Sequence, residues 1–252
     1  MAILITGDTH GGIDMHKLSR RELKSRGITI GEGDFLIILG DFGFPFLDSE
    51  VSKPGGEYHY WMKWFRERKY TILWIDGNHD NFCFWDKQPI TERFGGKVQV
   101  HPEAENVLHL MRGEIYEIEG KTFFTFGGAV SHDKSYRKPG ISWWAQEEAS
   151  PEEMKNAERN LKARDFKIDY ILTHTPPRAV LSEAPGLTYI KDRTADFLDE
   201  IMALTEYKLW LCGHIHRDCI IRSVRLAALY QSVAELSELE RELEASPFAG
   251  SN

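Results

Sequence analysis

The sequence predicts an α/β protein built on parallel strands, with antiparallel strands in its middle. Short β-branched or aliphatic runs alternate with segments of helical spacing, an alternation that is typical of βαβ units. Residues 97–126 differ, because strand-like runs there are separated by only a few residues. These strands should be antiparallel and form a second sheet or the edge of the first. The 252 residues are 42% hydrophobic and 12% aromatic, which is enough to bury a core and excludes a disordered chain.

The expected elements follow from these runs in chain order. The first three strands are connected by segments of helical spacing, and the α/β alternation resumes after the central antiparallel strands. No internal repeat or long Pro/Gly/Ser linker interrupts it. Strands are expected at residues 2–6, 34–39, 71–76, 97–100, 107–110, 114–118, 122–126, 169–173, 208–212, 219–224 and 226–230, and helices at 15–26, 57–69, 151–164 and 194–204.

The helix at 151–164 has the clearest start signal. Ser150 is a suitable N-cap, Pro151 occupies the first helical position, and two glutamates follow in the first turn. Apolar residues then recur at helical spacing, which predicts one face packed on the core. These residues are Met154, Ala157 and Leu161.

The segment 233–243 is predicted to be an amphipathic helix. Its apolar residues recur at spacings of three, three and four, and glutamates occupy the other faces. A stripe this short favours packing on the helix's own domain over an interchain coiled coil, which needs about three or four heptads. We therefore expect one domain over residues 1–232, followed by a C-terminal helix and frayed tail over 233–252. The stripe is Val233, Leu236, Leu239 and Leu243.

Charge and cysteine usage narrow the class of protein. The chain has 31 Lys and Arg against 39 Asp and Glu, a net charge of −8, which argues against coating nucleic acid or anionic membrane by electrostatics alone. Its three cysteines form neither a CxxC pair nor a disulfide scaffold, and the first residues lack the basic start of a signal peptide. The longest aliphatic runs are far shorter than the ~18 residues of a membrane span. A cytoplasmic protein is therefore expected.

Five of the predicted strands end on side chains that can bind metal ions. The strand at 2–6 leads into Gly-Asp-Thr-His, and the next two lead into Gly-Asp and Gly-Asn-His-Asp. The strands at 169–173 and 208–212 lead into a histidine and Gly-His-Ile-His. Ligand sites in parallel sheets lie beyond the carboxyl ends of the strands, so the five clusters can converge on one crevice. The donors are Asp8, His10, Asp41, Asn78, His174, His214 and His216.

Seven donors are too many for one structural zinc ion, which about four ligands satisfy, and they suit two ions that share a carboxylate. Glycine permits the tight turn beside an ion, and a D-x-H or H-x-H pair in extended chain places both side chains on one side. Four other histidines lack a glycine and a strand end beside them, so we interpret them as surface or hydrogen-bonded residues. They are His16, His59, His101 and His109.

In this order the clusters resemble the motifs of the calcineurin-like metallophosphoesterases. The blocks GDxHG, GD, GNH followed by Asp, a lone strand-end His and GHxH span residues 7–216. The resemblance implies a four-layer α/β/β/α sandwich of two central mixed β-sheets flanked by helices, with a dinuclear centre between the loops of the sheets. It also implies that Asp41 bridges two ions. Carried over, one ion would be held by Asp8, His10, Asp41 and His216, and the other by Asp41, Asn78, His174 and His214.

The sequence departs from one branch of this family. Phe42-Gly43-Phe44 follow Asp41 where the Ser/Thr protein phosphatase branch has GDxxDRG, so the arginine that this branch uses on phosphate is missing. Protein phosphatase activity is therefore in doubt, whereas the metal ligands are unaffected.

The predicted function is dinuclear-metal-dependent hydrolysis of a phosphoester by a phosphatase or phosphodiesterase. A hydroxide that bridges the metals would be the nucleophile, because metal binding can lower the pKa of water to about 7. His79 lies beside ligand Asn78 and is placed to protonate the leaving alkoxide, and Asp80 either orients His79 or caps a helix. The alternatives are a DNA or RNA nuclease of the same fold, which the net charge disfavours, and a non-catalytic protein-binding scaffold, which the complete ligand set disfavours.

Substrate choice is expected in the loop that follows the strand at 122–126. His132 and Arg137 are the candidate substrate contacts, since a guanidinium can bind two phosphate oxygens at once. Lys134 is a further cation in this loop, and Trp143 and Trp144 either stack on a base or belong to the core.

The expected cofactor and partners follow from the same residues. Mixed nitrogen and oxygen ligation without cysteine admits Mn, Fe, Zn, Co or Ni, of which we expect Mn. The expected partner is a small or nucleotide-type phosphoester substrate. No membrane and no obligatory nucleic acid are expected, and a homodimer is left open.

Overall fold

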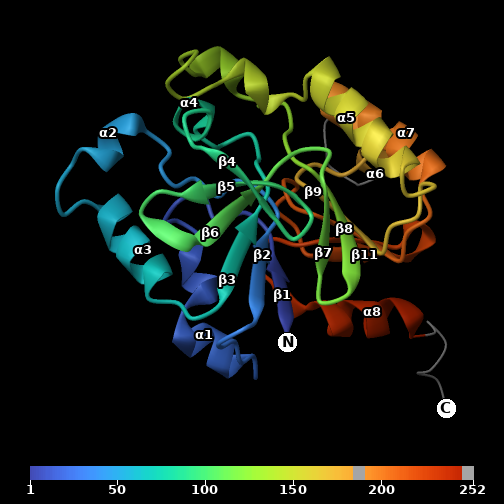
Figure 1. The fold of residues 1–252 in the computed structure, drawn as a ribbon, viewed down its shortest axis with the longest axis horizontal. Helices are drawn as coiled ribbons and strands as arrows, with labels where there is room; N and C mark the ends of the chain where they lie inside the picture. The colour runs from blue at the N-terminus through green and yellow to red at the C-terminus, as the bar shows by residue number, and fades with distance from the viewer. Residues whose placement is uncertain (184–190, 246–252) are drawn as a thin grey trace.

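Two mixed β-sheets lie face to face at the centre of the molecule (Figure 1). The computed structural model describes residues 1–183 and 191–245, so the expected frayed tail lies outside the described residues. In the first sheet, parallel strands occupy the middle and antiparallel strands the edges. Its order is β13 (Val233–Glu235), β1 (Ile3–Thr6), β2 (Phe35–Ile38), β3 (Thr71–Trp74), β6 (Ala104–Leu110), β5 (Gly96–His101) and β4 (Ile90–Arg93).

The second sheet repeats this plan, with parallel strands in the middle and an antiparallel strand at each edge. Parallel strands present their carboxyl ends at one end of a sheet, so each sheet gathers its strand-end loops there. The order is β11 (Cys219–Ile221), β12 (Leu226–Ala228), β10 (Leu209–Cys212), β9 (Tyr170–Thr173), β8 (Lys121–Phe126) and β7 (Ile115–Ile118).

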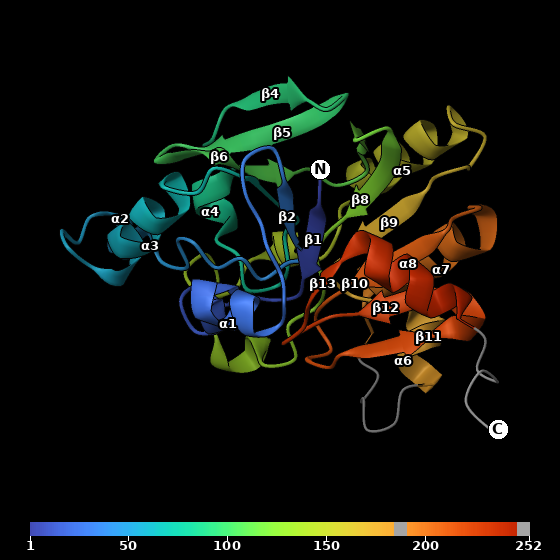
Figure 2. The same cartoon turned by 90° about the horizontal axis from the view of Figure 1, so that it is seen from below.

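Helices cover the outer face of each sheet, and the predicted four-layer sandwich is confirmed. Figure 2 shows the helices on opposite sides of the sheets. On the side of the first sheet lie α1 (Arg20–Ser25), α2 (Asp48–Val51), α3 (Glu57–Arg66) and α4 (Phe82–Trp85), and on the other side α5 (Pro151–Lys162), α6 (Arg178–Glu183) and α7 (Arg193–Leu204). Within the described ranges, none of the helices has the length and apolar character needed to cross a membrane.

Strand periodicity distributes the apolar residues between the layers. Along β1, Ile3 and Ile5 belong to the core between the two sheets, whereas Leu4 belongs to the core beneath the helices. Successive strand side chains point to opposite faces, so one apolar strand contributes to both cores. The second sheet does the same, with Leu211 between the sheets and Trp210 beneath α5 and α7.

The central stretch 97–126 divides between the two sheets. β5 and β6 form an antiparallel pair that extends the first sheet beyond β3, and β7 and β8 form an antiparallel pair at the edge of the second. The expected antiparallel pairing is therefore confirmed, but the stretch contributes two strands to each sheet, and in the first sheet β4 lies outside them at the edge. β4 was not predicted, because its residues are exposed or half-buried and lack an apolar run.

Two predicted helices begin later than expected. Residues 15–26 form a 3₁₀ turn, Met15–Leu18, and then α1, because the extended residue Ser19 accepts a hydrogen bond from Glu22 N and caps a new helix. In the segment 233–243, Val233–Glu235 is a strand that pairs antiparallel with β1 and covers its edge. The helix there, α8, spans Leu236–Glu244. In contrast, α5 has the predicted start, with Ser150 as its cap.

Packing of the C-terminal helix on its own domain is confirmed. Leu236 and Leu239 are buried in the core between the sheets, and Leu243 packs against it. β13 runs antiparallel to β1, with Val233 opposite Thr6 and Glu235 opposite Leu4, so α8 starts near the amino ends of the parallel strands. Figure 1 shows α8 beneath both sheets, away from the strand-end loops.

We predict that Leu239→Ala lowers the free energy of unfolding by about 2–4 kcal/mol, because it leaves a cavity in the core between the sheets. Leu204→Ala is the matched control, since this leucine is 59% exposed at the end of α7 and should change stability by less than about 0.5 kcal/mol. Chemical denaturation at several protein concentrations measures both. Equal effects of the two substitutions would contradict the packing described here.

Candidate metal centre

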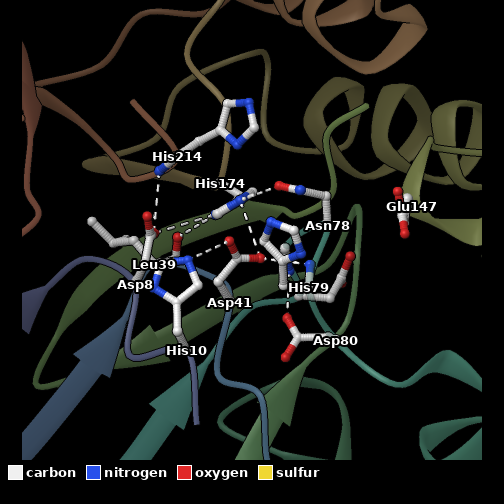
Figure 3. Close-up of polar contacts among 12 residues, drawn as sticks. Asp8, His10, Leu39, Asp41, Asn78, His79, Asp80, Glu147, His174 and His214 are labelled. Carbon is white, nitrogen blue, oxygen red and sulfur yellow. Dashed lines mark hydrogen bonds and ion pairs between the residues drawn. The ribbon is translucent and has the colours of Figure 1, made fainter. Parts of the chain in front are cut away.

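All seven predicted donors lie beyond the carboxyl ends of parallel strands. The first sheet supplies its donors after β1, β2 and β3, and the second sheet supplies the rest after β9 and β10. Figure 3 shows six of these donors, all except His216, near the strand-end loops of the two sheets. Strands far apart in the sequence thus build one site, which contains Asp8, His10, Asp41, Asn78, His174, His214 and His216.

One group of four donors forms a compact cluster. The ligand atoms of Asp8, His10, Asp41 and His216 all lie within 4.8 Å of one another. His10 Nε2 is 3.2 Å from Asp41 Oδ2, and His216 Nε2 is 3.1 Å from Asp8 Oδ2. The two carboxylates are buried, whereas the His216 side chain is 48% exposed, so the cluster is open to solvent on one side.

The remaining donors gather around His174 on the other side of Asp41. His174 Nε2 is 3.0 Å from Asn78 Oδ1 and 3.4 Å from Asp41 Oδ1. The rings of His174 and His214 have centroids 4.9 Å apart. His214 also donates its backbone N–H to Asp8 Oδ1 at 3.2 Å, which links this group to the first cluster.

The chemistry of the cluster fits a divalent cation. Asp8 Oδ2 and Asp41 Oδ2 are buried and accept no hydrogen bond. A buried carboxylate oxygen without a donor is costly, and a metal ion is one of the few partners that compensate for it. Imidazole nitrogens and carboxylate oxygens are ligands that divalent transition metals accept.

The electrostatics of His10 support the same conclusion. Burial lowers the pKa of this imidazole, but the close approach of the Asp41 carboxylate and the charges of Asp41 and Asp8 outweigh burial and raise the pKa to about 9. The carboxylates therefore create a place where positive charge is favourable, which a proton or a metal ion can supply. Burial instead lowers the pKa of His214 to about 3, which keeps it neutral, as a ligand must be.

The glycines of the motifs make room for ligands from neighbouring strands. A Cβ on Gly40 would lie 2.1 Å from His174 Nδ1, and a Cβ on Gly77 would lie 2.1 Å from Asp41 Oδ1. Four donors have left-handed backbone, with φ of 45° at His10, 48° at Asp41, 64° at His214 and 49° at His216. Non-glycine residues rarely adopt this region, and such strain is typical of functional sites.

Partners that the sequence analysis missed orient the donors. Asp14 Oδ2 is 2.8 Å from His10 Nδ1, and the Leu39 carbonyl is 2.8 Å from His174 Nδ1. Such contacts fix the ring and its tautomer, so that Nε2 faces a metal ion. The signal for Asp14 was its position four residues after His10. No sequence signal pointed to Leu39, whose carbonyl becomes a partner only through the fold.

A buried lysine and a tyrosine contact residues of the first cluster. Lys17 Nζ donates to the carbonyls of Gly7 at 3.1 Å and Asp8 at 2.7 Å, and also to that of Tyr230. The Tyr230 ring stacks on His216, with centroids 4.5 Å apart. These contacts tie the loop after β1 to the segment that follows β12.

His79 and Asp80 have different surroundings. The His79 backbone N–H donates to Asp41 Oδ1 at 2.7 Å, and its half-buried ring lies 5.7 Å from that of His10. Burial lowers the pKa of His79, whereas the charge of Asp41 opposes this effect.

The carboxylate of Asp80 accepts hydrogen bonds from the amides of Gly43 and Gly77, at 2.7 Å each, and so joins the loops after β2 and β3. The cap of α4 is Asn81, which accepts from Phe84 N.

The residues of the loop that was expected to select the substrate differ in how close they lie to the metal donors. Arg137 lines a cavity together with His10 and His79, and its guanidinium is bound to Asp133 Oδ1 at 2.6 Å. His132 is exposed, with its ring 6.0 Å from that of His214. Trp144 belongs to the interior, where its Nε1 is 3.2 Å from Cys83 Sγ. Lys134 lies over the ring of Trp143.

The four histidines that were set aside lie outside the cluster. Two of them have partners in the interior or at its edge: His109 lies between Gln99 and Asp76, and His101 is 3.4 Å from the Tyr58 hydroxyl. The other two are His16, which is exposed, and His59, which lies 3.5 Å from Glu103.

The sequence profile of the calcineurin-like phosphoesterases matches residues 1–218, a range that contains every donor of the cluster. The chain belongs to this family. The family is metal-dependent and hydrolyses phosphoester bonds, so the chain is a phosphoesterase with a candidate metal site at Asp8, His10, Asp41 and His216.

Solved structures are similar in fold at low sequence identity. One crystal structure is 12% identical, with a TM-score of 0.51 over 94% of this chain and 96% of its own. A Staphylococcus aureus protein described as a 5′-nucleotidase, in complex with α-ketoglutarate, is 13% identical with a TM-score of 0.49, over 96% of this chain and 58% of its own. Phosphopantetheinyl hydrolase from Mycobacterium tuberculosis is 15% identical with a TM-score of 0.40, over 98% and 93%. Among curated proteins, none matches the sequence significantly.

We predict that Asp14→Ala weakens metal binding by about 10- to 100-fold, because His10 loses the carboxylate that fixes its ring. Asp14→Asn should weaken it less, since an amide oxygen still accepts the hydrogen bond. Titration with Mn²⁺ followed by calorimetry measures the affinity. The control is Glu105→Ala, an exposed carboxylate on β6, and an equal loss in this variant would contradict the role of Asp14.

Proposed function

We propose that this phosphoesterase uses two metal ions and acts on small or nucleotide-type phosphoesters in the cytoplasm. The observation that carries the proposal is the arrangement of the Asp41 carboxylate. Its Oδ2 is 3.2 Å from Nε2 of His10, and its Oδ1 is 3.4 Å from Nε2 of His174. One buried carboxylate thus faces two sets of donors, which is the arrangement a bridging ligand needs. Asp8, His10, Asp41 and His216 would hold one ion, and Asp41, Asn78, His174 and His214 the other.

The choice of metal and compartment rests on the donor types and the cysteines. The two donor sets contain nitrogen and oxygen only, and Mn is our first choice over Fe, Zn, Co or Ni. Among the cysteines, Cys212 is buried, Cys83 is half-buried and Cys219 is exposed, and all three are unpaired thiols, as expected in a reducing compartment.

The chain's own residues divide the remaining tasks. The bound ions would supply Lewis acidity and a water of lowered pKa, which makes attack on phosphorus feasible near neutral pH. Arg137, which lines the cavity beside the cluster, would bind phosphate oxygens. His79 would donate a proton to the leaving oxygen, since its ring lies beside His10 and borders the same cavity. An anionic phosphoester beside His79 favours its protonated form, which opposes the effect of burial on its pKa.

Asp80 has a positioning role in this proposal. Its carboxylate binds the amides of Gly43 and Gly77, and each of these glycines lies within two residues of Asp41 or Asn78. Asp80 therefore sets the distance between the loops that carry a bridging ligand and a terminal one. His79 lies between Asn78 and Asp80, so the same contacts fix the position of its backbone.

We predict that Asp41→Asn abolishes binding of both ions and nearly all phosphoesterase activity, because the amide removes the negative charge that both ions share. Elemental analysis of the purified protein measures metal per chain, with two ions expected before the substitution. Asp48→Asn, an exposed aspartate on α2, is the matched control and should keep both ions. Two ions per chain and undiminished turnover in Asp41→Asn would refute the dinuclear proposal.

We also predict that His79→Ala keeps its metal but loses about 10²–10⁴-fold in rate on poor leaving groups, the range for general acid catalysis. The loss should be smaller on nitrophenyl esters, whose leaving group needs little protonation. Steady-state kinetics on alkyl and nitrophenyl esters measure the difference, with His59→Ala on α3 as the control. The same loss on both esters would show that His79 has another task.

A further inference from the structure

A cavity adjoins the metal centre on the side of His10 and His79. Its volume is about 540 Å³, which is within the range of about 300–1,000 Å³ for small-molecule sites. Away from the metal centre, its walls come from the loop after β1, from the connection between β2 and α3 that includes α2, and from the first turn of α3. Among these wall residues, only Gly11 belongs to the calcineurin-like motifs.

The position of His79 indicates which part of a substrate enters this cavity. The His79 ring borders it and lies 5.7 Å from the ring of His10. Figure 3 shows the two side chains on the same side of the site. In the proposed function, on which this inference rests, His79 protonates the leaving oxygen. The leaving alcohol must therefore lie beside His79, and the cavity is the space that opens there.

Aromatic and aliphatic side chains form much of the wall. Phe46 is half-buried at the edge of the cavity, with its ring 6.1 Å from that of Trp144. Phe44 and Tyr58 contribute from the core, and Ile13 is 79% exposed at the rim. Aromatic and aliphatic side chains that line one cavity of this size are typical of a site that binds an apolar or planar group.

Two glycines of the cavity wall lie in close contact with neighbouring segments. A Cβ on Gly12 would lie 1.9 Å from Glu57 Oε1, and a Cβ on Gly43 would lie 2.4 Å from Gly11 N. The Glu57 side chain and the Gly11 backbone already fill these positions, so the two glycines allow the segments that form the cavity wall to pack closely against one another.

The charged residues of the wall balance in number. Glu50 and Glu57 face Lys53 and Arg137, and Arg137 is itself paired with Asp133. Burial and the charge of Glu57 raise the pKa of Glu50, and the amide of Phe46 holds the Glu50 carboxylate at 3.1 Å. The wall thus offers acceptors for hydrogen-bond donors and no excess of positive charge for a second phosphate.

We propose that this cavity binds the leaving group of the substrate, and that this group is an alcohol that carries a planar aromatic ring with amino donors, as a nucleoside does. Phe46 would stack on the ring and Glu50 would accept from its amino group. Selection then depends mainly on residues 43–58, while the loop 131–138 contributes Arg137. This location differs from the sequence-based expectation, which assigned selection to that loop alone.

Kinetics on three phosphate monoesters distinguish the contact with Phe46 from the contact with Glu50. Adenosine 5′-monophosphate has a planar ring and an amino group, 1-naphthyl phosphate has the ring alone, and glycerol 3-phosphate has neither. Phe46→Ala should lower kcat/KM for the first two by about 5- to 20-fold relative to glycerol 3-phosphate, because stacking is lost. Glu50→Gln should lower kcat/KM for adenosine 5′-monophosphate by about fivefold relative to 1-naphthyl phosphate.

Two control substitutions lie outside the cavity. Ile90→Ala removes an apolar side chain that is 55% exposed on β4, and Glu105→Gln removes an exposed charge on β6. Both should leave the ratios among the three substrates unchanged. Equal effects of Phe46→Ala on all three substrates would overturn the proposal.

Binding of adenosine separates this inference from the proposed function, because adenosine has no phosphate and needs no hydrolysis. Calorimetry should show that the unsubstituted protein binds adenosine and that Phe46→Ala weakens binding by at least fivefold. If adenosine binds in this way but no ester is hydrolysed, the proposed function is wrong and the cavity assignment stands. If esters are hydrolysed but Phe46→Ala leaves adenosine affinity unchanged, the cavity assignment is wrong.

Discussion

The buried carboxylate of Asp41 is the interaction on which the rest of the site depends. It is 1% exposed, its oxygens lie near Nε2 of His10 and Nε2 of His174, and it also accepts the amide of His79. The charges of these histidines lower its pKa although burial raises it. A charge buried this deeply is stable only with positive partners close by, so the loops of both sheets must meet at this point.

The fold brings these loops together by close packing of backbone. Gly40 and Gly77 let His174 and Asp41 approach to distances that a Cβ would block. Asp80 then joins the two loops through the amides of Gly43 and Gly77. Its burial and the nearby charge of Asp41 raise its pKa to about 7, which shows how many acidic groups the site confines in a small volume. A cation relieves this repulsion, and the architecture thus favours metal binding.

The same architecture separates the metal donors from much of the wall of the cavity that we propose binds the leaving group. The metal donors follow strands whose backbone is held on both sides by neighbouring strands, so their positions are well defined. Much of the cavity wall comes instead from the connection between β2 and α3, where Phe46, Glu50 and Lys53 are not among the seven donors. Substitutions at these three positions can therefore change the cavity without replacing a donor.

The sequence by itself determined the alternation of parallel strands and helices, the antiparallel strands in the middle of the chain, the start of α5 and the seven donors of the candidate metal centre. These features depend on local signals: apolar runs, the Ser150 cap, and strand ends followed by donor residues. Only the tertiary structure decided that Val233–Glu235 pairs with β1 and that α8 covers the base of the sandwich. It also decided that the Leu39 carbonyl and Lys17 are partners of the site, and it decided the cavity beside His79. These roles depend on which backbone carbonyls and loops meet across the fold, and no local pattern in the sequence marks them.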